Sequence, residues 1–348
     1  MAFAEPPAGS GTGGSLERSF QAEILDVPGE LVEFINSSSR FIIAGHKEPD
    51  GDCVGSQLAL RSALFRLGKE AVICAEGPYK RTELRNYIDQ FVSIPKNPDP
   101  KARVIIVDCS SKERTGKLQD DLEKYPCAII DHHAAVTNLA SSKESPVYID
   151  AASPSCTLLV YKLIKALGLD LVEEEATLLL FGLCTDTGFF RHLTEKNSYA
   201  FEATADLIRC GANPKQVFNI INGGKSLNSR ILIGHILSRT ESYFDGRLLI
   251  CHETLNEFNT YGFESRDSDT LNQLLLSIEE VEAIVIIRQE CVDNCTVSLR
   301  STDKINVAQI AAGFGGGGHK NASGLSMKGD ISAVKQKMLK AFYSAFTK

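Results

Sequence analysis

Four short apolar runs alternate with helical patterns in the first 210 residues, and they constrain the fold more than any other feature. The runs are RFIIAG (40–45), AVICAEG (71–77), ARVIIVD (102–108) and CAIID (127–131). Each is rich in β-branched residues and short enough for a buried strand. The segment SQLALRSALFRLG (56–68) follows the first run with apolar residues at helical spacing and a closing glycine. This alternation predicts an α/β fold with a doubly wound parallel sheet.

The pattern changes beyond about residue 223. A helical segment, SRILIGHILSRTES (229–242), precedes three runs that are typical of antiparallel strands: GRLLICHE (246–253), EAIVIIRQ (282–289) and CTVSLRS (295–301). We therefore expect a first domain over 21–222, a linker helix within 223–241 and a smaller α+β domain over 242–348. The Gly/Pro/Ser-rich residues 1–20 are expected to form a disordered tail.

Composition narrows the classes of partner. A formal net charge of −7 argues against binding to long duplex nucleic acid, which favours a basic surface. The ten cysteines include no CxxC pair and several lie in apolar runs, which favours free thiols in the cytoplasm. No apolar run approaches the ~18 residues of a membrane span, so no membrane partner is expected.

Acidic and imidazole side chains follow the apolar runs where the predicted strands end. His46, Asp50 and Asp52 follow the first run, Asp108 ends the third, and Asp131-His132-His133 ends the fourth, while Asp186 ends the helical segment 173–186. Open α/β sheets build their sites at the carboxyl ends of strands. A single Asp in such a place is usually a turn or cap residue, but four such elements indicate a shared site. Converging carboxylates need a cation, and oxygen with imidazole ligands suits Mn²⁺, Mg²⁺ or Fe²⁺.

The motifs HKEPDGD, VDCS, DHH and TDTGFFR, in this order, resemble the four motifs of the DHH phosphoesterase superfamily. GFGGGGHKNASG is similar to the signature of the DHH-associated C-terminal domain of that superfamily. Within it, the two-domain layout most resembles the bacterial bifunctional oligoribonucleases and pAp phosphatases. The resemblance implies a hydrolase that degrades short RNA of about two to five nucleotides to mononucleotides and dephosphorylates pAp through two-metal catalysis.

The resemblance also implies a set of metal ligands and catalytic residues. One ion would be held by His46, Asp50 and Asp108, and a second by Asp52, Asp108, His132 and Asp186, so that Asp108 bridges them. Asp108, His133 and Asp131 would be catalytic: His133 would face the substrate phosphate, and Asp131 would support the neighbouring imidazoles. Mn²⁺ is the ion we expect, with Mg²⁺ or Fe²⁺ as alternatives.

Phosphate binding needs more positive charge than this centre supplies, because four ligand carboxylates balance two divalent ions. Successive N–H groups in the glycine run 316–318 could form an anion-binding nest. The candidate substrate contacts are Arg114, Arg191 with His192, Arg300 with Ser301, Gly316, Gly317, Gly318 and His319. The family pattern places Arg300 and His319 in the substrate cleft, where the second domain is expected to close over the nucleotide and favour short substrates.

Three alternatives stay open. A manganese-dependent inorganic pyrophosphatase would share the N-terminal motifs but lacks the glycine-rich signature, and a cyclic or linear dinucleotide phosphodiesterase would share both domains. A non-catalytic nucleotide sensor would be expected to have lost metal ligands, and none is missing here. Cys156 and Leu158 replace residues usual in the family, and the downstream spacing puts a contact from Asn138 in doubt. The expected partners are short RNA, mononucleotides or dinucleotides; a single chain and a homodimer both stay open.

Overall fold

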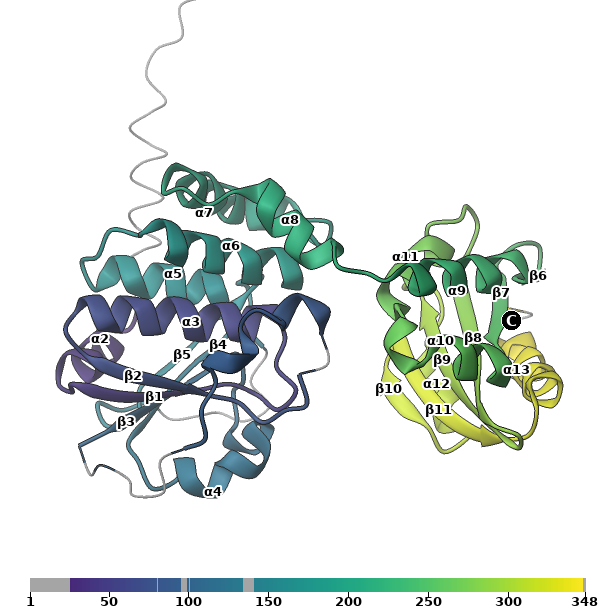
Figure 1. Cartoon of the computed structure of the whole chain (residues 1–348), viewed down its shortest axis with the longest axis horizontal. Coiled ribbons are helices and arrows are strands. Elements are labelled where there is room, and N and C mark those ends of the chain that lie inside the picture. Colours follow the sequence, from purple (N-terminus) through teal and green to yellow (C-terminus); the bar gives the residue numbers. More distant parts are fainter. Residues whose placement is uncertain (1–25, 80, 95–98, 100, 134–140, 347–348) are drawn as a thin grey trace, which may run out of the picture. The chain divides into compact units, whose positions relative to one another are not determined.

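The structure is a computed structural model, and it describes residues 26–346 except 80, 95–98, 100 and 134–140. The expected tail at 1–20 and Asn138 therefore lie outside the described residues. The chain divides into two compact units, unit 1 up to Gly224 and unit 2 from Lys225 (Figure 1). Each unit has a sheet and an apolar core of its own.

Unit 1 contains a five-stranded sheet in the order β2-β1-β3-β4-β5, and every pairing is parallel. The strands are β1 (Arg40–Ala44), β2 (Glu70–Cys74), β3 (Arg103–Val107), β4 (Cys127–Asp131) and β5 (Val147–Ile149). The first four are the apolar runs of the sequence, so the predicted doubly wound parallel sheet is confirmed. In this strand order β2 lies on one side of β1 and the later strands lie on the other, so the topological switch point is between β1 and β3. Open α/β sheets bind ligands at such a point.

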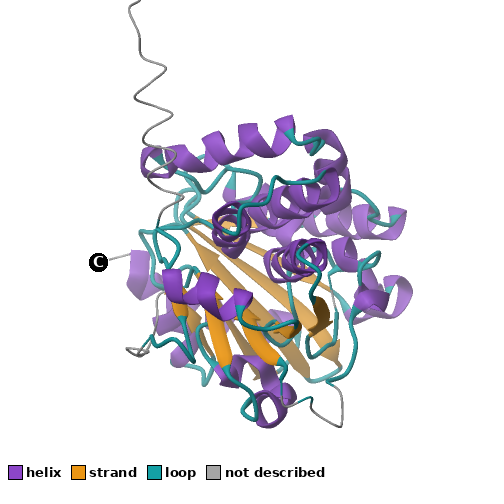
Figure 2. Ribbon diagram, turned by 90° about the vertical axis from the view of Figure 1, so that its left-hand side faces the viewer, coloured by secondary structure: helices purple, strands orange, loops and turns teal. Residues whose placement is uncertain are grey.

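Helices cover both faces of this sheet (Figure 2). The helices of unit 1 are α2 (Gly29–Asn36), α3 (Gly51–Arg66), α4 (Gln119–Leu122), α5 (Cys156–Ala166), α6 (Glu173–Asp186), α7 (Ser198–Arg209) and α8 (Pro214–Asn222). Short 3₁₀ turns lie between them: η1 (Thr82–Leu84), η2 (Ile88–Gln90), η3 (Lys112–Leu118) and η4 (Glu195–Asn197). The apolar residues of α2, α3 and α5 pack on one face and those of α4 on the other. Burial on both faces explains why the strands are continuous apolar runs.

Unit 2 contains a six-stranded sheet in the order β10-β11-β9-β8-β7-β6. The strands are β6 (Glu241–Tyr243), β7 (Leu248–Glu253), β8 (Ala283–Cys291), β9 (Asn294–Ser301), β10 (Gly317–His319) and β11 (Ala322–Lys328). The remaining elements are α9 (Leu227–Ser238), α10 (Leu255–Tyr261), η5 (Phe263–Ser265), α11 (Ser268–Leu276), α12 (Val307–Ala312) and α13 (Ile331–Phe346). The helix expected within 223–241 is α9, and its buried leucine and isoleucines pack into the core of unit 2.

One prediction for this unit was wrong in detail. The three apolar runs were expected to be antiparallel, but β7 and β8 pair in parallel, while β8 and β9 are antiparallel. The physical reason is the connection between the two strands. Parallel strands need a long crossover, and α10 and α11 form one between the end of β7 and the beginning of β8. The predicted α+β class holds.

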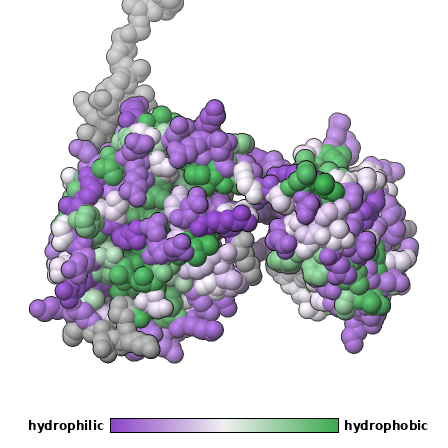
Figure 3. Space-filling model, in the orientation of Figure 1, coloured by the Kyte–Doolittle hydropathy of each residue, from purple (hydrophilic) through white to green (hydrophobic). Residues whose placement is uncertain are grey.

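The surface is mostly polar. Hydrophilic residues cover most of the face drawn in Figure 3, and apolar residues form scattered patches among them. Across the described residues, every helix is too short or too polar to span a membrane.

Candidate metal centre

The expected metal ligands of unit 1 lie around the carboxyl ends of β1, β3 and β4. Asp50 caps α3, where its Oδ1 accepts hydrogen bonds from the N–H groups of Asp52 and Cys53, each at 3.1 Å. This turn holds Asp50 and Asp52 at the start of a helix whose positive end favours carboxylates. The segment Pro49-Asp50-Gly51 therefore forms the start of α3.

His46, Asp50 and Asp108 form one group of side chains. The His46 Nε2 atom lies 3.8 Å from Asp50 Oδ1 and 3.4 Å from Asp108 Oδ2. A second group surrounds His132, whose Nε2 lies 3.1 Å from Asp186 Oδ2, 3.4 Å from Asp108 Oδ1 and 3.7 Å from Asp52 Oδ2. Asp108 thus presents one oxygen to each group, and the structure brings together all six residues expected as ligands.

The hydrogen bonding and charge of these groups fit divalent cations. Among the described residues, the buried atoms Asp108 Oδ1 and His132 Nε2 have no hydrogen-bond partner. Burial, together with the charges of Asp108 and Asp186, raises the pKa of Asp52 far above its usual range. Buried groups that lack partners and repel one another are the situation that a bound cation relieves.

The same carboxylates favour the protonated, charged form of the two histidines. Burial lowers the pKa of His46, but the carboxylates of Asp108 and Asp50 outweigh it and raise the pKa to about 10. Burial likewise opposes protonation of His132, yet Asp108, Asp186 and Asp52 raise its pKa to about 11. In the metal-free protein both imidazoles therefore carry the positive charge that the carboxylates require.

Asp108 also has an unusual backbone conformation. Its φ of 60° lies in the left-handed region, and its N–H donates to the Ile130 carbonyl at 2.9 Å. A non-glycine residue in this region costs about 1–3 kcal/mol, and such residues cluster at functional sites. The conformation turns the side chain from the end of β3 toward both groups.

The N-terminus of α5 holds Asp52 in place. The N–H of Cys156 donates to Asp52 Oδ2 at 2.6 Å, and the N–H and hydroxyl of Thr157 donate to Oδ1 at 2.9 and 2.6 Å. A Cβ on Gly182 of α6 would lie 2.9 Å from Asp52 Oδ1 and 2.3 Å from the Thr157 methyl group. Sequence reasoning missed Thr157, and Cys156, which replaces a residue usual in the family, contributes its backbone N–H.

His133 and Asp131 form a further pair beside the second group, with His133 Nδ1 3.7 Å from Asp108 Oδ1. Asp131 is buried, and its Oδ1 accepts from the His133 N–H at 3.1 Å and lies 2.8 Å from His133 Nδ1. Burial raises the pKa of Asp131, but these hydrogen bonds and the His133 charge outweigh it and lower the pKa. The ring of His132 instead has its Nδ1 3.3 Å from the Ser153 carbonyl, so Asp131 orients only His133.

Cys53 lies beside the first group, with its Sγ within 4.8 Å of the ligand atoms of His46 and Asp108. Burial, together with the charges of Asp108 and Asp50, raises the pKa of this thiol far above its usual range. The Sγ lies 3.7 Å from Gln57 Oε1. Cys53 is thus a neutral neighbour of the centre, and the donors remain oxygen and imidazole.

Arg81 lies near this centre, and the predicted Arg114 and Arg191 lie on chain segments that adjoin its ligands. Arg114 follows β3 on η3, its carbonyl accepts the Lys47 N–H at 2.7 Å, and its side chain is exposed. Arg191 is exposed five residues after Asp186. Arg81 was not predicted to belong to the site. Burial raises the pKa of Asp50, but His46 and, to a smaller extent, the charge of Arg81 outweigh it and lower the pKa. Nothing in the sequence around Arg81 marks it, because the fold alone brings it near Asp50.

In unit 2, Arg300 and His319 lie in one row across the sheet. Arg300 of β9 pairs with Ala322 of β11, which pairs with His319 of β10. Opposite residues on neighbouring strands share a face, so both side chains stand on the same side with only Ala322 between them, about 10 Å apart at the backbone. Gly317 and Gly324 form the adjacent pair on this face, which leaves its floor without large side chains.

Two other expected contacts are corrected by the structure. The Ser301 side chain is buried, and its hydroxyl donates to the Ile305 carbonyl at 2.7 Å, so it closes a loop instead of facing a ligand. The Gly316 N–H donates to the Ala311 carbonyl at 2.9 Å, and Gly317–His319 form β10. The prediction of an anion-binding nest with three free N–H groups is therefore wrong. Substrate contacts from Gly317 and Gly318 stay predictions.

Comparison with known proteins agrees with this architecture. The chain matches the model of the DHH family, N-terminal domain, over residues 40–183 and that of the DHHA1 domain over 251–348. The bifunctional oligoribonuclease and PAP phosphatase NrnA of Thermus thermophilus is 29% identical over 307 residues, 88% of this chain and 90% of the relative. Its counterpart in Bacillus subtilis is 27% identical, with 86% and 92% covered. The cyclic-di-AMP phosphodiesterase PdeA of Listeria monocytogenes is 26% identical over 91% of this chain but only 49% of the relative.

Solved structures share the fold. An exopolyphosphatase-related protein from Bacteroides fragilis superposes with a TM-score of 0.76 at 22% identity, over 94% of this chain and 97% of that one. RecJ from Thermus thermophilus, in complex with Mn²⁺, gives a TM-score of 0.52 at 15% identity, over 96% of this chain and 58% of that one. With both domain models matched and the six acidic and imidazole residues assembled in unit 1, the chain carries the N-terminal domain of the DHH family and a DHHA1 domain.

Proposed function

We propose that the chain is a metal-dependent phosphoesterase that hydrolyses short oligoribonucleotides, of about two to five nucleotides, to mononucleotides and converts pAp to AMP. The observation that carries the proposal is that the two carboxylate oxygens of Asp108 face different groups: Oδ2 faces His46 and Oδ1 faces His132. Two-metal phosphoesterases need such a shared carboxylate to hold two ions close together. The relatives in Thermus thermophilus and Bacillus subtilis, which are named for both activities, support this substrate class.

The ligands divide between two ions. His46, Asp50 and Asp108 would hold the first ion, and Asp52, His132 and Asp186 would hold the second together with Asp108. We propose Mn²⁺, because oxygen and imidazole donors without a thiolate suit it. When bound, such ions lower the pKa of water and neutralise negative charge on phosphate oxygens.

His133 is proposed to contact the substrate phosphate. Its side chain is 42% exposed, and Asp131 holds its Nδ1 at 2.8 Å. With Nδ1 bound in this way, Nε2 is the nitrogen that can donate to a phosphate oxygen as charge builds up during the reaction. Asp131 acts through His133 by fixing the orientation of the ring.

Further cations are proposed to hold the rest of the substrate. The four ligand carboxylates balance two divalent ions, so the exposed guanidinium groups of Arg114 and Arg191 would supply the net positive charge near the centre. Arg300 and His319, which share one open face of the unit 2 sheet, would contact the phosphate or sugar of the nucleotide.

The cytoplasm is part of this proposal. All ten cysteines are free thiols, and nine of them are at least partly buried. Free thiols in this number persist in a reducing compartment.

A product-resolved time course tests the proposal. The purified chain with Mn²⁺ is incubated separately with labelled RNA of two to seven nucleotides, pAp, cyclic di-AMP and pyrophosphate. We expect mononucleotides from the short RNA and AMP from pAp, and no turnover in excess chelator. Turnover confined to cyclic di-AMP or to pyrophosphate would instead assign the chain to one of those activities, and full turnover in chelator would refute a metal-dependent reaction.

A further inference from the structure

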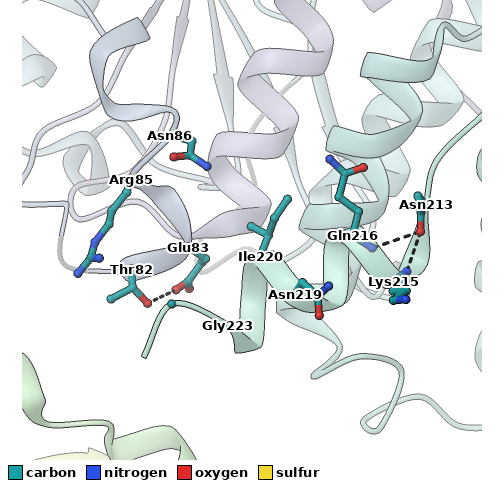
Figure 4. A pocket seen from close by; sticks show the side chains of 11 residues that line it. Thr82, Glu83, Arg85, Asn86, Asn213, Lys215, Gln216, Asn219, Ile220 and Gly223 are labelled. Atoms are coloured by element: carbon teal, nitrogen blue, oxygen red, sulfur yellow. Dashed lines mark hydrogen bonds between the residues drawn. The ribbon is translucent and has the colours of Figure 1, made fainter. Parts of the chain in front are cut away.

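Unit 1 has a polar pocket of about 510 Å³ that contains none of the proposed metal ligands (Figure 4). One wall is formed by η1 and the two residues after it, and the other by α8 and the glycines that follow it. Its lining includes Arg85, Asn86, Lys215, Gln216, Asn219 and Ile220. The pocket is large enough for a nucleotide, because small-molecule sites measure about 300–1,000 Å³.

The lining has an excess of positive charge in a chain whose net charge is −7. Within the described part of the chain, Arg85 and Lys215 have no ion-pair partner, although both are exposed. The single carboxylate of the lining, Glu83, is engaged: Thr82 Oγ1 donates to it at 3.5 Å, and Arg81 lies 3.9 Å away. Two uncompensated cations, one from each wall, suit an anionic ligand such as a phosphate group.

The lining also offers several side-chain amides. Asn86, Gln216 and Asn219 each present an amide that has no side-chain hydrogen bond within the described residues, and Figure 4 shows them on both walls. Side-chain amides supply a donor and an acceptor together, which is the combination that recognises the edge of an unstacked base. Phosphate-binding cations beside base-recognising amides point to a nucleotide.

One contact connects this pocket with the metal centre. Phe218 of α8, which lies beside the lining residues, packs edge-on against Phe189, with ring centroids 5.2 Å apart, and Phe189 follows Asp186 by three residues. The wall formed by α8 therefore adjoins the end of α6, which carries Asp186.

We infer that this pocket is a subsite for a nucleotide of the RNA strand beyond the pair of nucleotides joined by the cleaved bond. Arg85 and Lys215 bind phosphate groups of the strand, and the amides bind the base. The inference rests on the proposed function and adds to it, because it assigns the binding of a third nucleotide to unit 1. The compound pAp has a single nucleoside and cannot occupy the subsite while its phosphate is at the metal centre.

A double variant, Arg85→Gln with Lys215→Gln, tests the subsite. We expect kcat/KM for a pentanucleotide to fall about tenfold more than kcat/KM for pAp, since contacts to phosphate are lost only for the longer substrate. The slope of log KM for the pentanucleotide against log salt should also decrease by about one, because each phosphate contact on a single strand contributes about 0.7. Lys124→Gln with Lys143→Gln is the matched control, since it removes the same charge from exposed positions elsewhere.

The outcomes separate this inference from the proposed function. Equal losses on pAp and on the pentanucleotide, or the same loss in the control variant, would overturn the subsite. If the wild-type chain hydrolyses no RNA, the proposed function fails, and binding of a labelled pentanucleotide by fluorescence anisotropy decides about the subsite alone. Binding that weakens in the double variant and not in the control supports it, and unchanged binding refutes it. The double variant Asn86→Ala with Gln216→Ala keeps both cations, so it should weaken binding without changing the salt dependence of the affinity. Unchanged binding would refute the contact between these amides and the base.

Discussion

Metal binding should release protons from His46 and His132, and the pH dependence of the affinity should reveal this release. In the metal-free protein the pKa values of these imidazoles are raised to about 10 and about 11, so both are protonated at neutral pH. Each must lose its proton to bind a metal ion. Loading both sites between pH 7 and 8.5 should therefore release at least two protons, because Asp52, whose pKa is raised far above its usual range, can add a proton to those of the two imidazoles. The overall affinity should rise by at least two log units per pH unit.

The contrast with ordinary histidines is large. An imidazole with a pKa near 6.5 is already neutral above pH 7.5, so it would release almost no proton there. Titration calorimetry with Mn²⁺ in buffers of different ionisation enthalpy counts the protons directly. The variant His46→Ala should release about one proton fewer than the wild type. A release near zero at pH 8, together with an affinity that stays flat from pH 7.5 to 8.5, would refute the charge balance described for the metal-free centre.

Three further predictions concern other parts of the chain. The variants Arg300→Ala and His319→Ala should each bind two Mn²⁺ and retain slow hydrolysis of a small activated phosphodiester. Their activity on dinucleotides and pAp should fall roughly ten- to hundredfold. Loss of manganese, or an equal loss of activity on the small phosphodiester and on the nucleotides, would show that unit 2 does more than hold the nucleotide. Gly182→Ala should lower the unfolding free energy by about 1–3 kcal/mol and weaken metal binding, because the new methyl group would meet Asp52 and Thr157, and unchanged denaturation and metal titrations would contradict it. In unit 2, burial raises the pKa of Glu257, but its hydrogen bonds, with Arg239 first, outweigh this and lower the pKa to about 2. The resulting stabilisation is present above pH 4.5 and lost as the pH falls toward 2, so the difference in unfolding free energy between wild type and Glu257→Gln should shrink over that range, and a constant difference would contradict it.

The strand-end motifs could be recognised from sequence because their positions depend on local structure. His46, Asp50, Asp108 and His132 each follow a strand whose apolar pattern is plain, and parallel strands bring their carboxyl ends to one edge. Sequence alone could therefore predict both the sheet and the assembly of the ligands around it. The exposed side chain of His133 belongs to the same strand end.

The remaining features depend on contacts between distant segments. Thr157 supports Asp52 only because α5 begins beside α3, and Arg81 approaches Asp50 only because the chain after β2 passes the centre. The hydroxyl of Ser301 is used within its own loop, which a motif cannot reveal. The direction of β7 relative to β8 was missed for a similar reason, because apolar alternation does not distinguish parallel from antiparallel pairing.

The central claim is that Asp108 joins two metal ions, and the number of ions bound per chain tests it most directly. The wild type and Asp108→Ala are loaded with Mn²⁺, desalted and analysed for manganese, while circular dichroism checks that both are folded. The account predicts two ions per wild-type chain, at most one weakly held ion in the variant, and no hydrolysis of any substrate by the variant. Two ions bound by Asp108→Ala with wild-type affinity would contradict it.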